Sequence, residues 1–200
     1  METELNNTNH QAELAYEIIK GKTLANCAMQ TASGVLGGGS ALAADLIAVA
    51  AFYVPMWNEI RAVYGCGTIG MAEIMTVLKS AGPYLAADLV MDKVFGPIPV
   101  LGMPINYFCA KVMTWRLGTL FTFFASRGEG VNPNLAAWAS QFMIDVFPRG
   151  AFSFTKVPSR QHFVDFVSNA SGDSDYDCEV RIARAMETYK TRQGVTRKCE

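Results

Sequence analysis

The sequence predicts an all-α protein, made of an apolar helical body and a smaller, more polar helical C-terminal region. Half of the 200 residues are hydrophobic and only 18% are charged, which excludes a disordered chain. The charges are also uneven, since eleven lie between Gly21 and Ser126 and nineteen lie in the shorter stretch from Arg127 to Glu200. Apolar residues run in stretches of helical length that glycine and proline interrupt, so helices are expected rather than strands.

The chain is expected to divide into three parts. Residues 1–23 are predicted to form a polar N-terminal helix or arm, because Gln11 to Lys20 has a helical pattern. Residues 24–128 are predicted to form the apolar body. Residues 129–200 are predicted to form the polar region, with helices at 134–146, 159–167 and 178–193, after a join rich in helix breakers at 127–133.

The first apolar segment of the body carries a single charge. Residues 41–57 are apolar on every side of a helix apart from Asp45. A helix that is apolar all round is either deeply buried or in lipid. Val35 to Val54 reaches the length of a membrane span only by including glycines and this aspartate, so it is a borderline membrane helix. A core helix of a soluble bundle is the alternative.

A short repeat indicates a duplicated helical hairpin. The pentapeptide Leu-Ala-Ala-Asp-Leu occurs at residues 42–46 and again at 85–89, each time after a glycine and before a proline. The aspartate and the proline are Asp45 and Pro55 in the first copy, and Asp88 and Pro97 in the second. Each unit is predicted to run from a glycine break through an apolar helix to a proline break and a further helix. The uncharged residues 94–110 hold three prolines and are expected to form a kinked or re-entrant hairpin.

A glycine motif allows a different interpretation. Gly65, Gly67 and Gly70 match the spacing of a dinucleotide-binding turn. Asp92 lies at about the distance from this turn at which such folds have an acidic residue that binds ribose. Such a turn follows a strand, and residues 60–64 could form that strand or could continue a helix from the preceding proline. In the second case the glycines form a turn between helices, with Gly65 as the C-terminal cap.

Other chemistry finds little support in the sequence. Five dispersed cysteines and two histidines predict neither a disulfide framework nor a metal site. No pair of nucleophile and base stands out, so the protein is expected to be no enzyme and to need no cofactor. A net charge of -1 excludes a typical nucleic-acid binder. The polar, acidic N-terminus is unlike a secretory signal, so an intracellular chain that is not secreted is expected.

Two groups of residues resemble a known family. The first comprises Ala43 to Asp45 followed by Ala62 to Gly65, with Tyr64 before the glycine. The second comprises small, polar and proline residues at set positions: Pro99, Gly102, Asn106, Thr114 and Gly118. Together they resemble the YcjF-like domain of unknown function, a hydrophobic helical domain of bacterial membrane proteins that also occurs C-terminal to small GTPase domains. The resemblance covers roughly residues 24–128, and it implies membrane association and partnership with a separate GTPase. It implies no catalytic residues.

These observations lead to one functional prediction and two alternatives. The protein is expected to be a non-enzymatic, membrane-associated or assembly-forming module that embeds its apolar body in lipid or in partner subunits, as a homo- or hetero-oligomer. The first alternative is a soluble structural subunit or an apolar-ligand binder within a larger complex. The second alternative is a dinucleotide-binding protein that uses residues 65–70.

Overall fold

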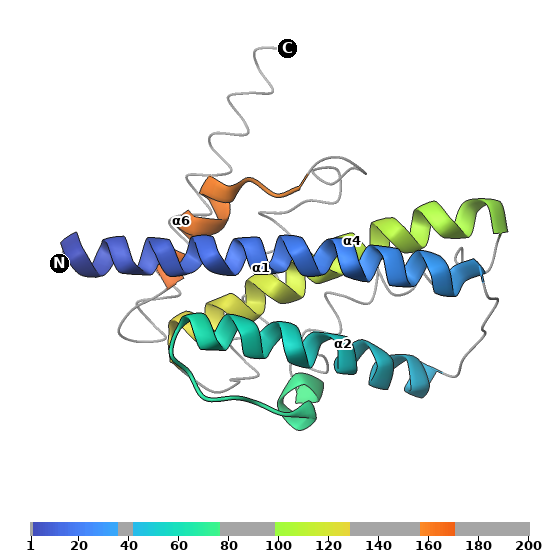
Figure 1. The fold of residues 1–200 in the computed structure, drawn as a ribbon, viewed down its shortest axis with the longest axis horizontal. Helices are drawn as coiled ribbons and strands as arrows, with labels where there is room; N and C mark the ends of the chain where they lie inside the picture. Colours follow the sequence, from blue (N-terminus) through green and yellow to red (C-terminus); the bar gives the residue numbers. More distant parts are fainter. Residues whose placement is uncertain (1, 36–41, 77–98, 129–156, 171–200) are drawn as a thin grey trace, which may run out of the picture.

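The computed structural model describes residues 2–35, 42–76, 99–128 and 157–170 (Figure 1). These residues are largely helical, and none of them belongs to a strand, so the all-α prediction is confirmed. The described helices are α1 (Glu2–Val35), α2 (Leu42–Val63), α4 (Pro99–Ser126) and α6 (Arg160–Ala170), with a further helical stretch at residues 71–76. The boundary between the polar arm and the apolar body was expected after residue 23. Helix α1 continues through this position without a break.

The helices pack around α4. This helix contacts α1 most extensively and also contacts α2 and α6 (Figure 1). Every side chain of α4 from Cys109 to Ala125 is buried, on all sides of the helix. Most of them are aromatic or aliphatic, and the hydroxyls of Thr119 and Thr122 donate to carbonyls one turn back in the same helix. This charge-poor helix is therefore covered within the fold, which is one of the two environments that such a helix can occupy.

The expected break at Pro55 is wrong. Helix α2 continues through this proline to Val63. Pro55 is exposed, whereas Tyr53, Met56 and Trp57 on the other side of the helix are buried. A proline inside a helix costs about 3 kcal/mol, and burying three side chains of this size contributes more than that. Packing against α4 therefore keeps the helix intact.

The hairpin expected over residues 94–110 is also corrected. Residues 99–110 are the first part of α4, which continues to Ser126, so no turn occurs between Pro99 and Ala110. Pro99 is the first residue of the helix, a position where proline leaves no backbone hydrogen bond unmade. Residues 94–98 lie outside the described ranges, as does the second copy of the repeat at 85–89.

The polar C-terminal region is described in part. Helix α6 corresponds to the helix predicted at residues 159–167, and the Ser159 carbonyl accepts the first backbone hydrogen bond, from Phe163 (3.1 Å). The helices predicted at 134–146 and 178–193 lie outside the described residues. Within the described ranges, no helix combines the length and the apolar character that crossing a membrane requires.

Candidate functional site

Gly65 ends α2 as a C-terminal cap, as one of the two interpretations of the glycine motif predicts. Its φ of 69° lies in the left-handed region that favours glycine. Its N–H donates to the Ala62 carbonyl (3.1 Å), and the Cys66 N–H donates to the Arg61 carbonyl (2.9 Å). This pair of bonds is a Schellman motif. Residues 60–63 are therefore helical, and the strand that a dinucleotide-binding turn requires is absent there.

The loop that follows is held against α2 by side chains. The Asn58 amide donates to the Ile69 carbonyl (3.1 Å), and its oxygen accepts from the Ile69 N–H (2.9 Å). The Arg61 guanidinium donates to the carbonyl of Gly67. The Gly70 N–H donates to the Glu73 carboxylate (3.1 Å), which caps the helical stretch at 71–76. Asn58 and Glu73 thus accept from the N–H groups of Ile69 and Gly70, and these bonds stabilise a turn between helices.

A buried polar cluster joins the three helices α1, α2 and α4. The Asn26 amide nitrogen donates to the Tyr53 hydroxyl (3.1 Å) and to the Thr114 hydroxyl (2.8 Å). The two hydroxyls are 3.2 Å apart, and Thr114 donates its proton to the Ala110 carbonyl (2.7 Å). Tyr53 is therefore the donor between the hydroxyls. These side chains are at most 3% exposed, so their hydrogen bonds fix the positions of the three helices relative to one another.

A thiol and an amine lie beside this cluster. Cys27 of α1 is 1% exposed, and its sulfur is 3.5 Å from the Tyr107 carbonyl oxygen. Burial raises the pKa of the Cys27 thiol to about 11, and the nearby Lys111 opposes this shift. Burial also lowers the pKa of the Lys111 amine. Both groups are thus shifted toward their neutral forms, as expected in a poorly solvated environment.

Replacing Cys27 with alanine is expected to make stability less sensitive to alkaline pH. The folded protein holds the thiol proton up to about pH 11, whereas the unfolded chain releases it near pH 9, so stability falls as pH rises between these values. Urea unfolding at several pH values from 8 to 11 measures this slope. Parallel stability curves for the wild type and Cys27→Ala would contradict the assignment.

A second feature of the contact between α1 and α4 is a close approach at Gly118. A Cβ atom at this position would lie 2.6 Å from Cγ1 of Ile19, 2.8 Å from its Cδ1 and 2.9 Å from its Cγ2. Ile19 is fully buried and has little room to move. Gly118 lies one helical turn after Thr114, so the two residues bring the same side of α4 against α1.

The other residues that the sequence singled out fall into two groups. Asp45, Pro99, Gly102 and Asn106 lie in α2 or α4, in parts of these helices where side chains are not described. Asp88, Asp92 and Pro97 lie outside the described residues. The sequence did not predict the roles of Asn26 and Ile19. A signal for Asn26 was present, because it is a polar residue within the charge-poor stretch that starts at Leu24. Among the described residues, no group of three or more Cys, His, Asp or Glu could hold a metal ion.

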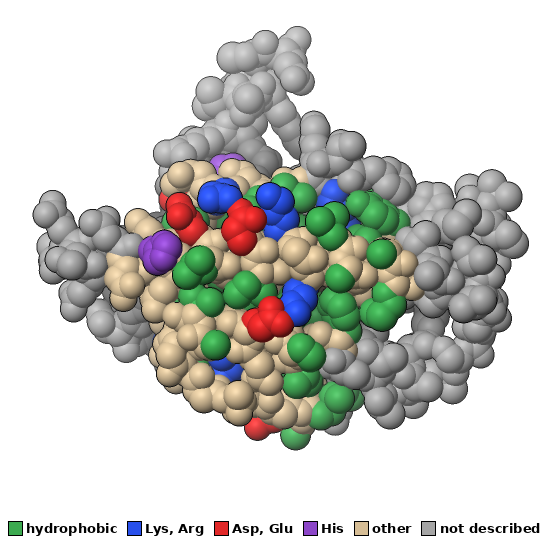
Figure 2. Space-filling view, in the orientation of Figure 1, with side chains coloured by type: hydrophobic (Ala, Val, Ile, Leu, Met, Phe, Trp, Pro, Cys, Tyr) green, Lys and Arg blue, Asp and Glu red, His purple; other side chains and the backbone are tan. Residues whose placement is uncertain are grey.

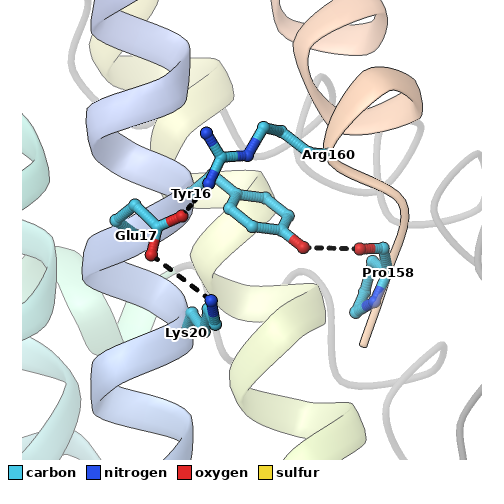
Figure 3. A network of polar contacts seen from close by, with 5 residues as sticks. All are labelled: Tyr16, Glu17, Lys20, Pro158 and Arg160. Atoms are coloured by element: carbon cyan, nitrogen blue, oxygen red, sulfur yellow. Dashed lines mark hydrogen bonds and ion pairs between the residues drawn. The ribbon is translucent and has the colours of Figure 1, made fainter. Parts of the chain in front are cut away.

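Helix α6 is anchored to α1 through Tyr16 (Figure 3). The Tyr16 hydroxyl donates to the buried Pro158 carbonyl (2.7 Å), and its ring contacts Phe163 with the centroids 5.6 Å apart. The Arg160 guanidinium lies over the same ring and pairs with Glu17, which also faces Lys20. These ionic side chains are about half exposed, so salt screens the attraction between them. The buried contacts of Tyr16 are therefore the main link between α1 and the start of α6.

Replacing Tyr16 with phenylalanine is expected to destabilise the protein by about 1–2 kcal/mol, because the Pro158 carbonyl loses its buried donor. Hydrogen exchange should show the largest loss of protection in residues 163–170. Tyr64→Phe is the matched control, since the buried Tyr64 hydroxyl has no partner in the part of the chain that the structure describes. Equal losses in both variants would contradict this role for Tyr16.

The outer side of α1 changes character along its length. Figure 2 shows charged side chains over its N-terminal half and hydrophobic ones gathered more densely toward its C-terminal end. Four exposed apolar residues lie there in two adjacent turns: Leu24, Ala25, Ala28 and Met29. Leu24 is 64% exposed and Met29 is 48% exposed. We call these four residues the α1 apolar face.

These contacts are of the kind by which helices pack against one another. The polar groups of the central cluster bond to one another and to the backbone, and the α1 apolar face is open. Comparison with family models, with curated proteins and with solved structures finds no match for this chain.

Proposed function

We propose that the protein is a non-enzymatic, assembly-forming helical module that docks a helix of another polypeptide on the α1 apolar face. The observation that carries this proposal is the exposure of Leu24 and Met29, which project on either side of the small residues Ala25 and Ala28. Single exposed apolar residues are common on protein surfaces, whereas apolar residues that gather on one face are a feature of interaction sites.

The spacing of the α1 apolar face suits a helix as the docked element. Leu24 and Ala28 are four residues apart, and so are Ala25 and Met29, so each pair lies along the helix surface. Two alanines between two long side chains leave room for the side chains of a second helix. Ala25 and Ala28 are three residues apart, so they also lie on the same side of the helix.

The charges around the α1 apolar face favour a protein partner over a lipid surface. Lys20 lies one turn before the face and pairs with Glu17. Lys22 pairs with Glu59 of α2. A helix that lies on a membrane carries an excess of lysine and arginine on its polar side, whereas protein interfaces have a mixed polar rim. The rim here carries both signs.

The buried polar groups support a structural role rather than a catalytic one. Asn26, Tyr53 and Thr114 are hydrogen-bonded to one another across three helices. Such a network rigidifies a core and specifies one packing arrangement. A rigid bundle of this kind holds α1 in place, so that the α1 apolar face is presented in a defined orientation.

The size of the native particle tests the proposal. The tagged chain should sediment well above its 21.8 kDa mass, either in cell extract or after purification. A double variant, Leu24→Glu with Met29→Glu, should sediment as a monomer while keeping its helical circular dichroism. Introducing carboxylates into the centre of an interface leaves them buried and unpaired, which is costly.

Leu14→Glu is the matched control. Leu14 is 43% exposed on the same helix but lies between Glu13 and Glu17, outside the α1 apolar face. This variant should keep the size of the wild-type particle. A wild-type chain that is monomeric both in extract and after purification would overturn the proposal. If the protein instead sediments with membranes and only detergent releases it, the α1 apolar face binds lipid. That result would also overturn the proposal.

A further inference from the structure

We draw no further inference here: the strongest candidate, the buried cluster in which Cys27 of α1 lies beside Lys111 of α4, rests on the pKa directions of these two groups alone, and no second observation among the described residues points to a ligand there.

Discussion

Replacing Gly118 with alanine is expected to destabilise the protein by about 1–3 kcal/mol, although alanine is the better helix former. The added methyl group would overlap three side-chain carbons of Ile19, all within 3 Å of its position. Since Ile19 is branched and fully buried, relief requires α1 and α4 to move apart. That separation would strain the hydrogen bond from Asn26 of α1 to Thr114 of α4. Denaturant unfolding of the wild type and the variant measures the effect.

Gly21 provides a matched control within α1. A Cβ atom there meets nothing within 4 Å, so Gly21→Ala should stabilise the protein by about 0.5–1 kcal/mol. The two glycine substitutions are therefore expected to have opposite signs. In an Ile19→Ala background, the cost of Gly118→Ala should disappear, because the overlapping carbons are gone. If Gly118→Ala were as favourable as Gly21→Ala, the close approach of the two helices would be wrong.

The second large effect is expected at Thr114. Thr114→Val keeps the shape of the side chain but removes the hydroxyl that accepts from Asn26 and Tyr53. Both donors would then face an apolar surface in a core that excludes water. Each buried group left without a partner costs about 1–3 kcal/mol, so we expect the two donors together to cost about 2–6 kcal/mol. Unfolding in urea, followed by circular dichroism, measures this loss.

Thr122→Val is the control for this prediction. Thr122 is also fully buried on α4, but its hydroxyl donates only to the Gly118 carbonyl in its own helix. That carbonyl lies within the helix and has its backbone hydrogen bond, so removal of the hydroxyl should change stability by less than about 1 kcal/mol. A cost at Thr122 equal to that at Thr114 would show that the three-helix cluster adds no stability beyond an ordinary buried hydroxyl.

Much of the helical architecture could be predicted from local pattern. Helical periodicity in residues 11–20 and 159–167 predicted parts of α1 and α6, and one of the two interpretations of the glycine motif predicted the cap at Gly65. The end of α4 at Ser126 coincides with the predicted helix breakers, and Gly128 there has a φ of 68°. These features depend on residues close together in the chain, so their sequence signals are local.

The candidate site was less predictable, because its contacts join residues far apart. Thr114 and Gly118 were singled out by resemblance alone, and their partners Asn26 and Ile19 were not found. Nothing in the pattern of α1 states which of its polar residues faces α4. The same limit applies to Pro55 and Pro99, since a proline's local preference predicts a break and only the packing around it decides the outcome.

The amino-acid sequence by itself determined that this chain is helical and that its body is poor in charge. These are consequences of backbone preference and composition, which each segment carries alone. Only the tertiary structure decided that α4 is covered by other parts of the fold, that two helices meet at a glycine, and that Leu24 and Met29 lie exposed on α1. Burial is a property of pairs of segments, so the hydrophobicity of one segment cannot specify which other segment covers it.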